Sequence, residues 1–122
     1  MYKEVHFGGD YFFKNADFTG EKQTSDVFEL GYTAGGIRVH GWIDGKATAA
    51  SGKTVKVALL ASYSKDAGFA VLNETTVTAG DAGISGDIFG FVPDTDLSYM
   101  KVEVTGAEGV SGKFSVAVEY IP

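Results

Sequence analysis

The feature that most restricts the fold is a repeated alternation of apolar and polar residues in short runs separated by glycines. Between residues 53 and 63, for example, Val55, Val57 and Leu59 alternate with Thr54 and Lys56. A period of two places successive side chains on opposite faces of a β-strand. Runs of this kind span residues 24–30, 37–44, 53–63, 69–78, 87–92, 98–104 and 113–120. With part of the first twenty residues as a further strand or a clasping arm, we expect about eight strands.

The composition favours sheet over helix. Val, Ile and Thr together number 28, whereas Leu and Met together number 7. Residues branched at Cβ suit strands, and 17 glycines suit the turns between them. A chain of 122 residues has the size of one domain. We therefore predict an all-β, single-domain antiparallel β-sandwich or barrel, with an aromatic-rich segment at residues 1–23 as arm or first strand and the body of the fold at residues 24–122.

The phase of each alternation predicts which side chains form the core. The expected core positions are Val55, Val57, Leu59, Met100, Val102, Val104, Val116 and Val118. In the run 37–44, Ile37, Val39 and Ile43 lie on one face, and the opposite face carries polar and aromatic residues. A shift of one residue would move an entire strand to the opposite face, so burial tests these assignments.

Charge and cysteine content exclude several classes of function. The formal net charge of −6 has the wrong sign for binding a nucleic acid directly. The chain contains no cysteine, which excludes disulfides, thiolate metal sites and cysteine nucleophiles. The first residues lack the apolar core of a signal peptide, and no stretch is long enough to cross a membrane as a helix. We expect synthesis in the cytoplasm and no membrane partner.

The apparent chemical motifs are incomplete. Residues 47–54 end in Gly-Lys-Thr like a phosphate loop, but a strand follows in place of the required helix, so we predict a turn. Replacing Lys53 with Ala should then leave function intact, and ATP should not raise the melting temperature. His6 and His40 are isolated, and residues 93–96 (PDTD) match only part of a calcium loop or of a glycosidase carboxylate pair. We expect no catalysis, no cofactor and no metal ion.

Aromatic residues offer the clearest candidates for binding. Residues 1–18 hold six aromatics, which either the domain's own core or a neighbouring chain must cover, and we expect the segment to pack against a neighbouring subunit or another surface. The face of residues 37–44 is the second choice, and an alternative is a sugar-stacking platform made of Trp42, Tyr32 and Tyr63. The interface candidates are Phe7, Tyr11, Phe12, Phe13, Phe18, Arg38, His40 and Trp42.

Five segments, taken in order, resemble a known family. They are residues 26–31 (DVFELG), 68–75 (GFAVLNET), 91–93 (FVP), 98–104 (SYMKVEV) and 112–118 (GKFSVAV). Their order and spacing resemble the single-jelly-roll capsid cement, or decoration, proteins of tailed bacteriophages. The aromatic stretch before residue 18 departs from the short start of that family.

The resemblance implies a jelly-roll sandwich without enzyme activity or cofactor. It implies a structural virion protein on the capsid exterior, which binds the assembled major capsid protein and associates with itself, commonly as a homotrimer. The alternative function, from a different class, is a carbohydrate-binding or receptor-binding β-sandwich module.

Overall fold

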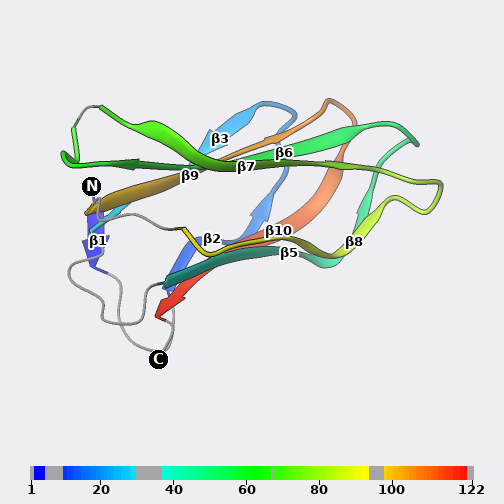
Figure 1. Cartoon of the computed structure of the whole chain (residues 1–122). Helices are drawn as coiled ribbons and strands as arrows, with labels where there is room; N and C mark the ends of the chain where they lie inside the picture. The colour runs from blue at the N-terminus through cyan, green and yellow to red at the C-terminus, as the bar shows by residue number, and fades with distance from the viewer. Residues whose placement is uncertain (1, 5–9, 30–36, 67, 94–97, 121–122) are drawn as a thin grey trace.

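The computed structural model describes residues 2–4, 10–29, 37–66, 68–93 and 98–120. This part of the chain contains strands and no helix. The strands are β1 (Tyr2–Glu4), β2 (Asp10–Asp17), β3 (Lys22–Thr24), β4 (Val27–Glu29), β5 (Ile37–Thr48), β6 (Thr54–Ser62), β7 (Ala70–Thr78), β8 (Ile84–Phe91), β9 (Tyr99–Gly106) and β10 (Ser111–Tyr120). They form two layers that face each other across the core (Figure 1).

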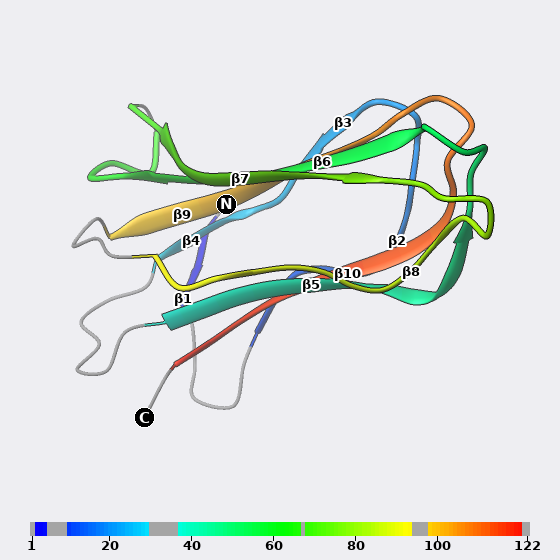
Figure 2. The ribbon, with the colours of Figure 1, turned by 45° about the vertical axis from the view of Figure 1, so that its right-hand side comes forward.

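The order of the strands identifies a jelly roll. One sheet has the order β2-β10-β5-β8, and the other has the order β1-β4-β9-β6-β7 with β3 also on β9. Since β3 and β4 pair with successive stretches of β9, they share one strand position. The result is two facing layers of four main strand positions each, with the short β1 added at the edge of one of them, and the chain passes back and forth between the layers as in the double Greek key of a jelly roll (Figure 2). The predicted all-β, antiparallel sandwich is confirmed, although the short β1 pairs in parallel with β4.

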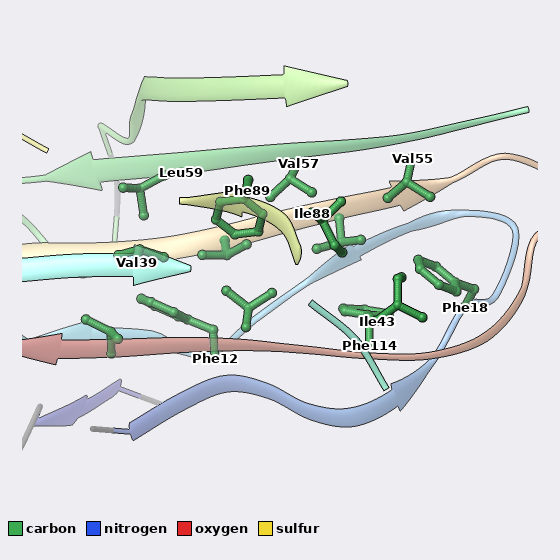
Figure 3. Packing of buried hydrophobic residues seen from close by; sticks show 14 of the residues in the cluster. Phe12, Phe18, Val39, Ile43, Val55, Val57, Leu59, Ile88, Phe89 and Phe114 are labelled. Carbon is green, nitrogen blue, oxygen red and sulfur yellow. The ribbon is translucent and has the colours of Figure 1, made fainter. Parts of the chain in front are cut away.

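The core lies between the two sheets and contains every predicted core residue. All eight predicted positions are buried, with exposed fractions of 1% or less. Large aromatic side chains join them, among them Phe12, Phe18, Phe28, Phe89 and Phe114, as Figure 3 shows for most of this cluster. The register deduced from the alternation of residues 53–63, 98–104 and 113–120 is therefore correct.

Strand boundaries differ from the prediction at β5, which continues to Thr48, at residues 24–30, where β3 ends and β4 begins, and at β8. The alternation predicted a strand from residue 87, but β8 begins at Ile84. The strand passes through Gly86 with a positive φ of 75°, and its pairing with β5 shifts register on either side of Trp42. These irregularities interrupt the alternation, which is why the sequence pattern did not extend to the first residues of the strand.

Candidate functional site

The outer face of the β2-β10-β5-β8 sheet carries an aromatic cluster, which we define as Tyr11, His40 and Trp42. His40 and Trp42 point outward because Val39 and Ile43, on the opposite phase of β5, are buried in the core. The ring centroids of His40 and Trp42 are 5.2 Å apart. Tyr11 of β2 reaches the cluster across β10, and its ring meets the Trp42 ring edge-on at 6.1 Å.

A hydrogen-bond network centred on Asp44 holds the indole of Trp42 in place. The indole Nε1–H donates to Oδ1 of Asp44 at 3.0 Å, and the Ser115 hydroxyl donates to Oδ2 of the same carboxylate at 2.6 Å. The backbone N–H of Asn15 donates to the Ser115 hydroxyl oxygen at 3.1 Å. The Asn15 side-chain amide, with its nitrogen toward Asp44, adds contacts of 3.0 and 3.3 Å. Trp42 therefore presents its ring in one fixed orientation.

The local backbone of β2 makes this network possible. Asn15 has a positive φ of 50°, and the register between β2 and β10 shifts between Phe114 and Val116 and again before Ala117. Asparagine tolerates the left-handed region better than most residues. The bulged strand turns the Asn15 amide toward Ser115, which is only 1% exposed.

Charged side chains surround the aromatic cluster. The Arg38 guanidinium lies 3.2 Å from the Glu119 carboxylate, and Lys113 lies 3.0 Å from Asp17. Both pairs are largely exposed, so each contributes little to stability. Beside the cluster lies a shallow hollow whose lining residues are Arg38, His40, Asp87, Ile88, Phe89 and Gly90.

The structure brings together four of the eight interface candidates. Tyr11, Arg38, His40 and Trp42 share the outer face of one sheet. Sequence reasoning had placed Tyr11 in the N-terminal segment and the other three on a separate second-choice face. The pairing of both β2 and β5 with β10 joins the two sets.

Phe12 and Phe18 require a correction. They were interface candidates, but they are 7% and 9% exposed and lie in the core of their own domain. Phe12 stacks on Phe28 with centroids 4.3 Å apart, and Phe18 packs on Phe114 at 4.6 Å. Burial in the sandwich already covers these rings, so they need no partner chain.

The other two candidates in the N-terminal segment differ from this pair. Phe13 is partly buried against the core, with its ring 5.1 Å from that of Phe114. Phe7 lies outside the described residues. The sequence left open whether the aromatic-rich segment is an arm or a strand. Residues 10–17 of this segment form a strand within a sheet.

The predicted sugar platform is not assembled as proposed. Trp42 lies on the β2-β10-β5-β8 sheet, whereas Tyr63 follows β6 of the opposite sheet and is 75% exposed. These two rings do not share a face. Tyr32 lies outside the described residues.

The Gly-Lys-Thr run is a turn, as predicted. The backbone N–H of Gly52 donates to the Ala79 carbonyl at 2.9 Å, and that of Lys53 donates to the Ala50 carbonyl at 3.1 Å. These amides are occupied within the fold, and β6 follows directly. The turn therefore lacks the converging free amides with which a phosphate loop binds its anion.

The described residues also bear on metal sites and membrane spans. Within the described ranges, no group of three or more His, Cys, Asp or Glu residues is arranged to hold a metal ion. Asp94 and Asp96 of the partial calcium motif lie outside those ranges. No helix long and apolar enough to span a membrane occurs in the described part of the chain.

Asp44, Asn15 and Ser115 were not identified from the sequence. Asp44 follows Trp42 on the outward phase of its strand, so the alternation alone suggested a polar neighbour for the indole. The other two residues are distant in the sequence from their partners. Ser115 lies 71 positions from Asp44, and Asn15 lies 100 positions from Ser115. Only the pairing of β10 with both β2 and β5 reveals their contribution.

Comparisons with known proteins support the fold. No protein-family profile matches the sequence, and no curated protein matches it. Among solved structures, the chain is similar to the infectious bursal disease virus VP2 subviral particle, with a TM-score of 0.50 and 13% identity over 92% of this chain. The aligned region is 32% of the VP2 chain, so the chain spans about a third of that protein.

Two carbohydrate-binding modules are also similar. A CBM28 described as specific for non-crystalline cellulose has a TM-score of 0.49 and 13% identity, covering 93% of this chain and 73% of that one. A CBM4 has a TM-score of 0.46 and 15% identity, covering 96% of this chain and 74% of that one. At such low identity, the likeness to VP2 shows the fold alone, a β-sandwich shared with a viral particle protein.

Proposed function

We propose that this chain is a structural protein of a phage virion that decorates and stabilises the capsid by binding the assembled shell of major capsid protein. The observation that carries the proposal is the aromatic cluster on the outer face of the β2-β10-β5-β8 sheet. In this proposal the chain lies on the capsid exterior, contacts the shell through that face, and acts without catalysis or cofactor.

The cluster has the physical properties of a protein-binding anchor. Trp, Tyr and Arg are enriched among the residues that contribute most to protein interfaces. Tyr11 is 39% exposed, and Arg38 lies on the same face. Because Asp44 and Tyr11 hold the Trp42 ring in place, binding costs little side-chain entropy.

The charge of the chain agrees with an exterior position. A net charge of −6 keeps a small protein soluble and disfavours contact with packaged nucleic acid. The resemblance also implies self-association, commonly as a homotrimer. Docking through the outer face requires only that this face remain accessible in the assembled form.

A carbohydrate-binding module is the second candidate, because Trp42 and Tyr11 are aromatic rings beside hydrogen-bonding groups. The ring geometry favours the first proposal. The planes of Tyr11 and Trp42 meet at 69°, and those of His40 and Trp42 meet at 37°. The three rings do not lie in a common plane, so they offer successive sugar rings of a polysaccharide no flat surface on which to stack.

Co-sedimentation with capsid shells tests the proposal. Purified empty shells of the phage that encodes the chain are incubated with wild-type protein, with Trp42→Ala and with Tyr63→Ala, and the pelleted protein is quantified. Tyr63 is the matched control, because it is an exposed aromatic on the opposite sheet. We expect wild type and Tyr63→Ala to pellet with equal affinity and Trp42→Ala to bind at least about 30-fold more weakly, as for an interface hot spot.

A parallel arm uses the same three proteins on immobilised non-crystalline cellulose and xylan. Retention on polysaccharide that is lost in Trp42→Ala, together with no pelleting on shells, would replace the capsid proposal with the carbohydrate one. Shell binding by Trp42→Ala as strong as that of wild type would place the contact elsewhere. Circular dichroism of each variant checks that the sandwich remains folded.

A further inference from the structure

Strand β7 (Ala70–Thr78) lies at the edge of its sheet. It pairs with β6 on one side, and no described strand pairs with its other side. In the strand order of this sheet, β7 lies at the end opposite β1 and β4. An edge strand presents a row of backbone N–H and C=O groups that another strand can bind.

The hydrogen bonds at the end of β7 show which residues face away from β6. The backbone N–H of Ala79 donates to the Lys53 carbonyl at 2.7 Å, and the Ala79 carbonyl accepts from Gly52 at 2.9 Å. In an antiparallel ladder, residues that bond to the partner strand alternate with residues that point away from it. Val77 and Thr75 therefore bond to β6, as does Ala79.

The residues between them direct their backbone groups to the open side. These residues are Glu74, Thr76 and Thr78. The register supports this assignment, because Thr78 lies opposite Thr54, whose carbonyl accepts from Ala107 on the other side of β6. The backbone N–H and C=O of Thr54 thus face away from β7, and those of the opposite residue, Thr78, face away from β6.

The other long edge strands are irregular, whereas β7 is not protected in this way. β8 contains Gly86 at positive φ and has two register shifts. β2 also has two register shifts, contains the charged Lys14, and has Asn15 at positive φ. Proteins commonly use bulges, lysines and prolines to prevent edge pairing. β7 has nine residues (AVLNETTVT) without Lys, Arg, Pro or Gly, and its single register shift lies before Asn73.

The charge of β7 is also neutralised within its own sheet. Glu74 is its only ionisable residue, and the Lys56 ammonium lies 3.5 Å from the Glu74 carboxylate. Both side chains are more than half exposed, so this pair contributes little to stability. It does reduce the repulsion that two copies of β7 would otherwise experience.

We propose that β7 pairs antiparallel with β7 of a second copy of this chain, about a two-fold axis at Thr76. In this register Thr76 faces its own equivalent, and Glu74 faces Thr78 of the other copy on both sides of the axis. All three outward-facing residues then exchange backbone hydrogen bonds. In every other register at least one of them faces a residue outside this set, and the register centred on Glu74 places two carboxylates directly opposite each other.

A second copy fits this edge because the strand is complementary to itself. A two-fold interface needs the same surface on both chains, and residues 74–78 meet that condition with Thr–Thr and Glu–Thr pairs. The pairing joins two six-stranded sheets into one continuous layer. It leaves the aromatic cluster free, because that cluster lies on the opposite sheet.

Sedimentation equilibrium of the full chain tests the proposal with two substitutions at Thr76. Thr76→Pro removes the outward N–H but no bond to β6, and Thr76→Lys places two ammonium groups opposite each other at the axis. Thr24→Lys is the matched control, since Thr24 is exposed on β3 at the far side of the same sheet. We expect a two-chain mass for wild type and Thr24→Lys, in place of the homotrimer that the resemblance implies, and a one-chain mass for both Thr76 variants.

Amide hydrogen exchange followed by NMR supplies the residue-level readout. The amides of Glu74, Thr76 and Thr78 should exchange slowly at high concentration and quickly on dilution, whereas those of Thr75 and Val77 should stay protected at both. A one-chain mass for wild type at the highest soluble concentration would overturn the proposal. So would a two-chain or three-chain mass that neither Thr76 variant changes, or a capsid protein strand that protects these amides while the free chain stays single.

Discussion

Among single residues, Asp44 has the greatest influence on the outer face, because one carboxylate accepts hydrogen bonds from both Trp42 and Ser115. Asp44→Ala leaves the Ser115 hydroxyl, which is 1% exposed, without its acceptor. We expect a loss of about 1–3 kcal/mol in the free energy of unfolding. Urea denaturation measures this loss, and the fluorescence of the single tryptophan should report a more mobile indole.

Asp81→Ala is the control for this substitution. Asp81 is an exposed carboxylate in the turn before β8, so its removal should change stability by no more than about 0.5 kcal/mol. Equal effects of the two substitutions would show that the network around Asp44 adds nothing beyond a general effect of charge.

Two glycines allow backbone strain to be separated from crowding. Gly45 and Gly83 both have a φ of +84°, but a Cβ at Gly45 meets nothing within 4 Å, whereas a Cβ at Gly83 meets the Ala47 carbonyl oxygen. Gly45→Ala should cost about 1–2 kcal/mol, the usual penalty of the left-handed region. Gly83→Ala should cost clearly more, and chemical denaturation of the two variants compares them. Equal costs would mean that the chain near Ala47 yields without penalty.

At the scale of elements, β2 places adjacent aromatics in opposite environments. Phe12 is 7% exposed in the core, and Tyr11 is 39% exposed on the outer face. Phe12→Ala should therefore cost about 3–5 kcal/mol of unfolding free energy. Tyr11→Ala should cost much less but should weaken shell binding. Thermal unfolding and co-sedimentation distinguish the two, and a reversed order of stability would contradict the register of β2.

The contrast between β2 and β6 shows what a sequence pattern can predict. In β6 and β9 the alternation fixes which side chains face the opposite sheet, because these two strands pair in a regular ladder without a register shift. In β2, two register shifts and the positive φ of Asn15 break the alternation. The aromatic density there correctly indicated burial, but the pattern could not show that Phe12 and Phe18 are covered by their own domain.

The outer face of the β2-β10-β5-β8 sheet shows the same limit. The outward phase of β5 predicted that Arg38, His40 and Trp42 lie together, because they belong to one strand. Tyr11 and Ser115 join them only through the pairing of β10 with both neighbours, which connects residues far apart in the sequence. Contacts within a strand follow from a period of two, whereas contacts between strands depend on topology.

For the whole molecule, the N-terminal segment joins the two layers. β2 belongs to one sheet and β3 to the other, and Phe18 lies between them against Phe114. Residues 10–24 therefore contribute to both sheets and to the core that they enclose. Without these residues, the remaining strands would lack the edge strand β2 of the β2-β10-β5-β8 sheet and the core side chains of Phe12 and Phe18.

Truncation tests how far the fold depends on this segment. Deleting residues 1–18 removes β2 and the side chains of Phe12 and Phe18, and a buried phenylalanine alone is worth about 3–5 kcal/mol. The two together approach or exceed the total stability of about 5–15 kcal/mol that is typical of a domain. We expect the truncated chain to lose its β-sheet circular dichroism and its cooperative thermal transition. Deleting only residues 1–9, which spares β2, should keep both, and a folded 19–122 fragment would show that the sandwich closes without β2.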